Sequence, residues 1–122
     1  MRKIKFRGLQ ALPLPGKQHF VYGCVTELNG PGEGIAMMDV GVHGERWQVL
    51  MDTVGQYTGL TDKNNTEIYE GDILSDGEDV CSVVFWNGSF CLNRTTDYDE
   101  LSMCCIKDWE VVGNIHEHKE VL

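Results

Sequence analysis

Two acidic side chains, Glu70 and Asp72, are separated by one residue within VGQYTGLTDKNNTEIYEGDIL, residues 54–74. Side chains at positions i and i+2 of a β-strand point to the same face, so the pair would stand side by side if this segment were extended. Neighbouring carboxylates can divide general acid and general base roles when a pocket shifts their pKa values. One hypothesis is therefore an enzyme that acts on a small ligand through these two residues.

The same segment also has a structural interpretation at most of its positions. Asp62 can accept hydrogen bonds from backbone N–H groups two or three residues later, and Asn64 and Asn65 tolerate left-handed backbone conformations. Gly71 permits a bulge or a bend. A calcium loop starting at Asp62 is excluded, because its sixth position is glutamate and its twelfth is isoleucine. We expect these polar groups to shape the backbone instead of performing chemistry.

The cysteines and histidines do not form a recognisable metal site or disulfide framework. The five cysteines are odd in number, two of them are adjacent, and no C-x-x-C spacing occurs; they lie at positions 24, 81, 91, 104 and 105. We expect them to be small buried hydrophobic residues in a reducing compartment. A mixed site using His116 and His118 with one or two cysteines is the alternative. No nucleophile elbow or phosphate-binding loop is present. The sequence therefore predicts no metal, no cofactor and no catalytic residue.

Length and composition indicate one globular domain, or at most a domain with an accessory subdomain. The chain has 122 residues, of which 42% are hydrophobic and 24% charged, an ordinary balance for a folded protein. No apolar stretch approaches the roughly 20 residues that a membrane span requires. The basic start MRKIKFRGLQ is followed by GLQALPLPG, which is too short and proline-rich for the core of a signal peptide. We expect a cytoplasmic protein that does not bind membranes.

The net charge of −9 is unevenly distributed along the chain. Residues 1–26 contain five basic and no acidic side chains, whereas residues 27–122 contain five basic and 19 acidic ones. Nucleic-acid binding needs a basic face that releases counterions, and only the N-terminal strand could supply it. A basic edge that meets an acidic surface, within one subunit or between subunits, fits the distribution better. A nucleic-acid-binding small barrel remains the alternative hypothesis.

The pattern of apolar and turn residues predicts a mainly β protein with little helix. Two prolines and a glycine interrupt the pattern in ALPLPGKQ, residues 11–18. Asn87-Gly88, between two apolar runs, predicts a type I′ hairpin. Residues 97–108 would suit either a strand or a short helix. Strands are expected in KIKFRG, HFVYGCVTEL, IAMMDVGV, ERWQVLM, DILS, DVCSVVFW, GSFCLNR and DWEVVGNIHE.

The spacing of these strands predicts a small SH3-like or similar β-barrel. Residues 54–122 would form this barrel-like core, and residues 1–53 would form an N-terminal β subdomain with variable loops, together one compact unit. In the first strand, Ile4 and Phe6 alternate with basic side chains, which predicts a half-buried strand with Arg7 on the opposite face. Aromatic anchors of the core or of an interface are expected at Trp47, Trp86 and Trp109.

Three blocks of the chain closely resemble the YopX family of phage and prophage proteins. They are RKIKFRG at the start, VGQYTGLTDKNNTEIYEGDIL in the middle and EVVGNIHEH near the C-terminus. In that family an IKFR strand, a GQYTGLxDxNGxxIYEGDI block and a VIGNIxEN block recur in this order. Asn65 stands where the family usually has glycine, and asparagine also adopts the left-handed turn conformation. His118-Lys119 replaces the usual asparagine-proline.

The resemblance implies a small, mostly β, phage-encoded protein that assembles into homo-oligomers, and it carries over no activity. We therefore expect a non-enzymatic accessory protein of the bacterial host cytoplasm that associates with itself and binds another protein, with nucleic acid disfavoured. The polar side chains among the family-motif residues are the candidate interaction residues, in a buried hydrogen-bond network or a subunit contact. They are Gln56, Tyr57, Asp62, Tyr69, Glu70, Asp72 and Asn114.

Overall fold

The computed structural model describes residues 4–12, 19–30, 32–41, 44–94 and 98–118. Most of them lie in antiparallel β-strands, and helix is limited to three short 3-10 turns within these ranges. The mainly β prediction is therefore confirmed. The chain divides between Gln56 and Tyr57 into two compact units, called unit 1 and unit 2 below. Lys3, the proline-containing segment 13–18 and Lys119 lie outside the described residues.

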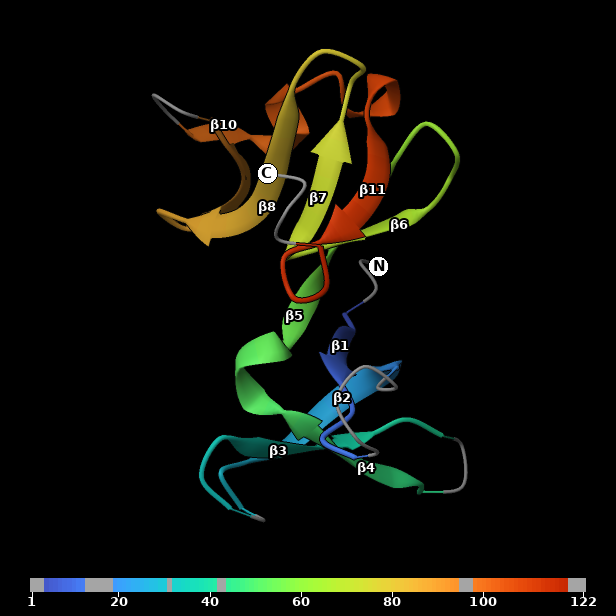
Figure 1. Cartoon of the computed structure of the whole chain (residues 1–122), viewed down its shortest axis with the longest axis vertical. Helices are drawn as coiled ribbons and strands as arrows, with labels where there is room; N and C mark the ends of the chain where they lie inside the picture. The colour runs from blue at the N-terminus through green and yellow to red at the C-terminus, as the bar shows by residue number, and fades with distance from the viewer. Residues whose placement is uncertain (1–3, 13–18, 31, 42–43, 95–97, 119–122) are drawn as a thin grey trace. The chain divides into compact units, whose positions relative to one another are not determined.

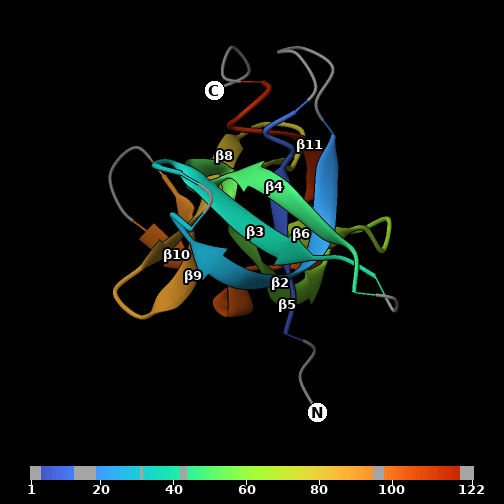
Figure 2. The same ribbon diagram turned by 90° about the horizontal axis from the view of Figure 1, so that it is seen from below.

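Unit 1 is an antiparallel sheet with the strand order β4-β3-β2-β1-β5. Asn29 and Gly34, between β2 and β3, both have positive φ, and Asn29 Oδ1 accepts a hydrogen bond from the N–H of Gly34 at 3.0 Å. Figure 2 shows β2, β3 and β4 side by side. The elements are β1 (Phe6–Leu9), β2 (Phe20–Leu28), β3 (Ile35–Asp39), β4 (Arg46–Leu50), the 3-10 turn η1 (Met51–Thr53) and the start of β5 (Gly55–Thr61).

The core of unit 1 is small and leaves no room for side chains at two glycines. Its fully buried hydrophobic residues are Ala36, Met38 and Val49. A Cβ on Gly8 would lie 3.0 Å from the Met38 Sδ, and a Cβ on Gly23 would lie 2.0 Å from the carbonyl oxygen of Asp39. Glycine at these two positions therefore allows the strands to approach one another closely.

The side-chain pattern predicted for KIKFRG is wrong at two positions, of which Ile4 precedes β1 and Arg7 lies in it. Ile4, expected on the apolar face, is 60% exposed, whereas Arg7, expected among the basic side chains of the opposite face, is only 5% exposed. The Arg7 guanidinium lies 4.4 Å from the centroid of the Phe20 ring. A weakly hydrated guanidinium on an aliphatic stem can be buried when it stacks on an aromatic ring, and local alternation does not reveal such a partner.

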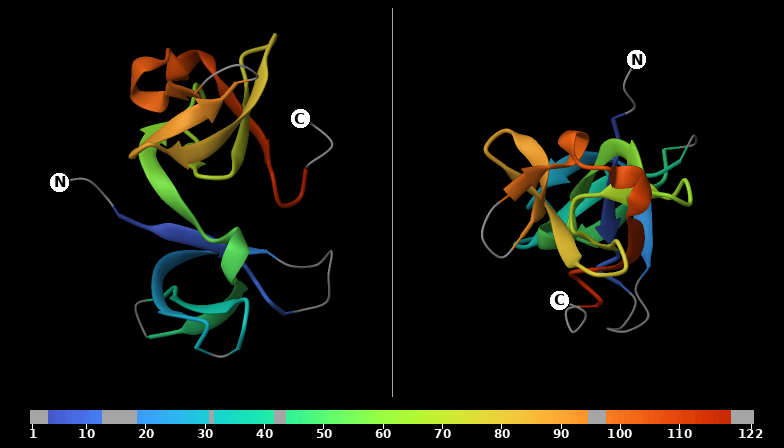
Figure 3. Two further views of the ribbon diagram at one scale, coloured as in Figure 1. Left: turned by 90° about the vertical axis from the view of Figure 1, so that its left-hand side faces the viewer. Right: turned by 90° about the horizontal axis from the view of Figure 1, so that it is seen from above.

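Unit 2 contains a five-stranded antiparallel sheet with the order β10-β9-β8-β7-β11, and β5 continues into this unit and pairs with β6. In Figure 1, β7 lies between β8 and β11. Figure 3 shows the 3-10 turns η2 and η3 as short orange-red coils. The bounds are β6 (Glu67–Tyr69), β7 (Asp72–Ser75), β8 (Val80–Trp86), β9 (Ser89–Asn93), β10 (Tyr98–Glu100), η2 (Leu101–Met103), η3 (Ile106–Asp108) and β11 (Glu110–Asn114).

The hairpin between β8 and β9 confirms the prediction made from Asn87-Gly88. These residues have φ values of 51° and 87°, and the flanking Trp86 and Ser89 face each other in the ladder. Asparagine and glycine adopt this left-handed conformation readily, so the turn closes with two residues. Residues 98–108 contain both a short strand and two 3-10 turns, so each structure considered for this region is present in part.

The described strands do not close into a barrel, so the predicted SH3-like barrel is not confirmed. Within these residues, β10 and β11 form the two ends of the sheet of unit 2 and do not pair with each other. The outer edge of β11 is partly occupied by a loop, because the N–H of Val111 donates to the Asp62 carboxylate and the N–H of Lys63 donates to the carbonyl of Trp109. Covering an edge strand in this way is an alternative to closing the sheet.

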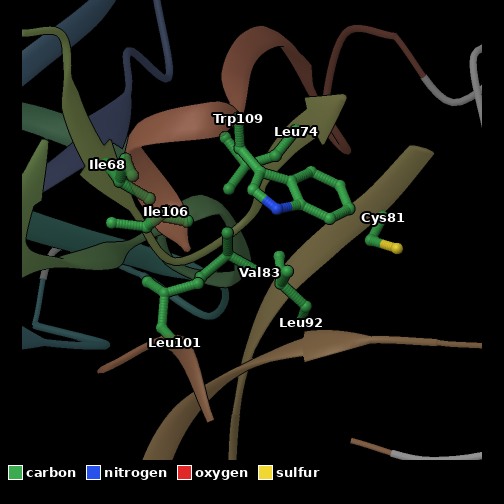
Figure 4. Close-up of a cluster of buried hydrophobic side chains, with 8 residues drawn as sticks. All are labelled: Ile68, Leu74, Cys81, Val83, Leu92, Leu101, Ile106 and Trp109. Atoms are coloured by element: carbon green, nitrogen blue, oxygen red, sulfur yellow. The ribbon is translucent and has the colours of Figure 1, made fainter. Parts of the chain in front are cut away.

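The core of unit 2 is built around Trp109, which lies just before β11. Figure 4 shows its indole ring among hydrophobic side chains from the sheet and from the 3-10 turns. The prediction of a core tryptophan is therefore confirmed for Trp109, whereas Trp47 and Trp86 are exposed. The buried cluster comprises Ile68, Leu74, Cys81, Val83, Leu92, Leu101, Ile106 and Trp109.

No helix within the described ranges is long and apolar enough to cross a membrane.

Candidate functional site

Asp62 is a buried carboxylate that is fully engaged with the backbone. It is 1% exposed. Its Oδ1 accepts hydrogen bonds from the N–H groups of Asn64 and Thr66 at 2.8 and 2.9 Å, and its Oδ2 accepts one from the N–H of Val111 at 2.9 Å. Burial raises the pKa of Asp62, but these hydrogen bonds and the charge of Lys107 outweigh it and lower the pKa below its ordinary value of 3.8. The Asp62 side chain is therefore an anion, and it holds a turn and a strand in place.

The turn that Asp62 organises contains the expected left-handed residue. Asn65 has a φ of 62°, and its N–H donates to the carbonyl of Asp62 at 3.0 Å. In the family pattern that the sequence resembles this position is glycine, and asparagine supplies the same backbone conformation. The prediction that asparagine can adopt the left-handed conformation in this loop is thus confirmed at Asn65.

Glu70 and Asp72 do not lie on one strand. β6 ends at Tyr69 and β7 begins at Asp72, so Glu70 and Gly71 form the turn between them, with Gly71 at a φ of 93°. Asp72 is 2% exposed, and its Oδ2 accepts a hydrogen bond from the N–H of Tyr69 at 2.7 Å. The paired orientation that an extended segment would give is absent, because the chain turns between the two residues. Gly71 supplies the bend that was one of its two predicted roles.

Asn114 organises the turn that follows β11. Its Oδ1 accepts hydrogen bonds from the N–H groups of His116 and Glu117, each at 3.0 Å, and its Nδ2 donates to Glu117 Oε1 at 3.0 Å. The N–H of Asn114 donates to His118 Nδ1 at 3.2 Å. Among the described residues, no group of three or more histidine, cysteine, aspartate or glutamate side chains could hold a metal ion. Asn114 and His118 therefore serve the local backbone here.

The remaining candidate residues are not gathered into one site. The rings of Tyr57 and Tyr69 are 5.5 Å apart, and the Tyr69 hydroxyl donates to Glu67 Oε1 at 3.4 Å. Gln56 belongs to unit 1, where it faces Phe6 in the ladder between β1 and β5. Within unit 2, Asp72 and Asn114 face each other across β7 and β11. Backbone pairing therefore links several family-motif residues, without directing their side chains into a common cavity.

Unit 2 contains a cavity of about 510 Å³ that none of the predicted site residues lines. It is formed where the turn after β7, the end of β9, β10 and the 3-10 turns come together. Sequence reasoning missed it because these segments are separated along the chain, and the only local sign was the density of acids at the start of residues 97–108. Its walls are Asp76, Arg94, Tyr98, Asp99, Glu100, Cys104, Cys105, Asp108 and Trp109.

Arg94 is the central charged group of this cavity. Its guanidinium forms ion pairs with Asp99 and, at 3.4 Å, with Asp79, and lies 5.6 Å from the centroid of the Trp109 ring. Asp76 Oδ1 accepts hydrogen bonds from the N–H groups of Asp79 and Glu78 at 2.7 and 2.9 Å, which lowers the pKa of Asp76. The cavity wall is therefore charged and dominated by carboxylates, of which Asp76 and Asp99 have partners.

Two of the cysteines in this region, Cys81 and Cys104, are poor nucleophiles. Burial raises the pKa of the thiols of both Cys81 and Cys104, so both are held in the protonated, less reactive form. The Cys104 thiol donates to the carbonyl of Glu100 at 3.2 Å. Cys81 and Cys91 are buried as expected, whereas the expectation is wrong for Cys24 and Cys105, which are exposed; all five are free. The cavity can attract a cation, but the Cys104 thiol in its wall is not activated for covalent chemistry.

Comparison with known proteins connects these observations to one family. The family model described as YopX protein matches residues 27–122. The matched range contains the turn of Asp62, the β6–β7 turn, the cavity and the Asn114 turn, and it begins after the N-terminal RKIKFRG block. No curated protein shows significant similarity to the chain.

Proposed function

Because the chain belongs to the YopX protein family, we propose that it is a phage or prophage accessory protein that associates with itself and binds another protein. It acts without catalysing a reaction, and it works in the cytoplasm of the bacterial host. The observation that supports this most is the use of the polar family-motif side chains. Asp62, Asp72 and Asn114 each accept hydrogen bonds from backbone N–H groups, so these polar side chains stabilise the backbone structure.

An enzyme that uses Glu70 and Asp72 is disfavoured by this geometry. A general acid or base must reach a substrate, whereas Asp72 is buried and bonded to the N–H of Tyr69. Neither carboxylate lines the cavity of unit 2. The thiols of Cys81 and Cys104 have raised pKa values, which also weighs against a nucleophilic role. A protein-binding function requires none of these activated groups.

Nucleic-acid binding, the alternative, is disfavoured by charge. The basic N-terminal strand would have to contact phosphates, yet Arg7 is buried against Phe20. Residues 57–122 contain 14 acidic and four basic side chains, which would repel a phosphate backbone. A fluorescence-anisotropy titration at low salt with single- and double-stranded DNA and RNA tests this alternative; binding to any of them would favour it over our proposal.

Self-association is tested by size-exclusion chromatography with multi-angle light scattering on the full chain. We expect a mass that is a multiple of the 13.7 kDa of one chain at micromolar concentration. A strict monomer would contradict the proposal. Protein binding is tested by affinity capture from infected or lysogenic bacteria, followed by reconstitution of the identified pair from purified components. A captured protein that does not bind in the reconstituted system would not support the proposed protein-binding function.

A further inference from the structure

Two exposed aromatic rings from strands of the unit 2 sheet stack on each other. Trp86, at the end of β8, and Tyr98, at the start of β10, have ring centroids 4.5 Å apart and planes inclined by 10°. They are 48% and 41% exposed, respectively. Tryptophan and tyrosine are the side chains that most often supply the binding energy of protein interfaces. A pre-stacked pair loses little side-chain entropy on binding, so it is suited to contact a partner.

Tyr98 also lines the acidic cavity described above, so the aromatic pair and the cavity adjoin. The cavity wall carries four carboxylates and one guanidinium, and the guanidinium of Arg94 is already paired with Asp99. Glu100 and Asp108 are exposed, and their side chains make no hydrogen bond or ion pair with another residue in the described part of the chain. The surface therefore presents unneutralised negative charge beside two flat rings.

Arg94 demonstrates which chemical group this surface accommodates. Its guanidinium lies near the Trp109 ring and between the carboxylates of Asp79 and Asp99. A guanidinium is planar, is weakly hydrated, stacks on aromatic rings and can bond a carboxylate through two N–H groups at once. A second guanidinium entering from outside would meet the same combination of groups at Tyr98 and Glu100.

We propose that the Trp86–Tyr98 pair and the acidic cavity together form a docking site for an arginine-bearing segment of the partner protein. This inference rests on the protein-binding function proposed above and adds the chemistry of the partner. The arginine side chain stacks on the exposed rings and directs its guanidinium to Glu100 and Asp108. The excess of 14 acidic over four basic side chains in residues 57–122 accelerates the encounter with a basic segment.

The test uses a defined probe, acetyl-Gly-Arg-Gly-Arg-Gly-amide, and the full chain in its native assembly. Matched peptides replace arginine with citrulline, which has the same shape without the charge, or with lysine. Binding is followed by amide chemical-shift changes in ¹⁵N-labelled protein. We expect changes at residues 98–100 and Cys105 and at the Trp86 indole N–H. We expect the affinity of the citrulline peptide to be about tenfold or more below that of the arginine peptide, since a charge-assisted contact is lost. The lysine peptide should also bind more weakly than the arginine peptide.

Charge variants locate the site. Glu100→Gln combined with Asp108→Asn should lower the affinity for the arginine peptide about fivefold or more, and Trp86→Ala should also lower it. The matched control is Glu78→Gln with Asp52→Asn, which removes the same charge from exposed positions outside the cavity and should change affinity less than about twofold. Folding of each variant is checked by its amide spectrum.

The proposed docking site would be overturned if both double variants lost affinity equally or if the chemical-shift changes were spread over all acidic surfaces. It would also be overturned if the citrulline or lysine peptide bound as tightly as the arginine peptide. An absence of peptide binding would also overturn it. Light scattering and reconstitution with a captured partner are measured separately. An oligomer that binds its protein partner but not the peptide would refute this inference alone, whereas a monomer that captures no protein would refute the proposed function itself.

Discussion

The Oδ2 atom of Asp62 accepts a hydrogen bond from the backbone N–H of Val111, 49 residues further along the chain, at a distance of 2.9 Å. Together with the pairing of β7 and β11, this contact joins the central YopX block to the C-terminal one. The other oxygen of the same carboxylate holds the turn that contains Asn64 and Thr66. The two family blocks are therefore one structural unit, in which an acidic side chain both closes a turn and covers the edge of β11.

Replacement of Asp62 by alanine should destabilise the protein severely. The substitution removes the acceptor of three partly buried backbone hydrogen bonds, at a cost of about 3 kcal/mol in the free energy of unfolding. Urea unfolding followed by tryptophan fluorescence measures this, because the buried Trp109 belongs to the same unit. Glu78→Ala, an exposed acid in unit 2, is the control and should change stability little. Equal effects of the two substitutions would contradict the role assigned to Asp62.

The stability contributed by Asp62 should disappear in acid. The pKa of Asp62 in the folded protein is below its ordinary value of 3.8, so folding favours the anion, and its contribution is fully present above the unfolded pKa. As the pH falls below 3.8 through the lower folded pKa, this contribution is lost. The difference in free energy of unfolding between wild type and Asp62→Asn should therefore shrink in this range. Measurement of both proteins in urea at several pH values tests it, and a difference independent of pH would refute it.

Local features of the fold were predictable because their causes are local. The Asn87-Gly88 hairpin follows from the preference of both residues for positive φ, and the bend at Gly71 has the same origin. Whether the strands close into a barrel was not predictable, since closure depends on pairing between strands far apart in the sequence. The burial of Arg7 depends on the ring of Phe20, which belongs to another strand. Alternation along β1 alone therefore gave the wrong environment for this arginine.

The same distinction applies to the candidate site. The sequence suggested Asp62, Asp72 and Asn114 as candidate interaction residues, and the hydrogen bonds they make follow from local turn chemistry together with one long-range contact at Asp62. The cavity escaped sequence reasoning because Asp76, Arg94 and Trp109 approach one another only after the sheet of unit 2 has formed. No spacing in the sequence encodes that proximity.

Substitutions at Asn65 should separate backbone conformation from side-chain chemistry. Asn65 has a φ of 62°, so Asn65→Gly should be close to neutral or slightly stabilising, as glycine adopts this conformation without strain. Asn65→Val should cost about 1–2 kcal/mol, because a β-branched residue is strained there. Thermal unfolding of the two variants provides the comparison. A loss of stability in the glycine variant as large as in the valine variant would show that the asparagine side chain matters beyond its backbone preference.

The five thiols should react with Ellman's reagent in an order set by exposure and by pKa. Cys24 and Cys105 are exposed and should react first. Cys104 should follow more slowly, because it is partly covered and burial raises the pKa of its thiol, which reduces the thiolate fraction at neutral pH. Cys81 and Cys91 are buried, so they should react only at the rate of unfolding.

The control for this order is the protein in denaturant, where all five thiols should react rapidly and alike. Cys105→Ser should remove one fast-reacting thiol from the native protein and leave the slow phases unchanged. Mass spectrometry of the labelled peptides assigns each phase to its cysteine. Rapid labelling of Cys81 in the native protein would contradict the packing of the unit 2 core, since this thiol belongs to the same cluster as Trp109.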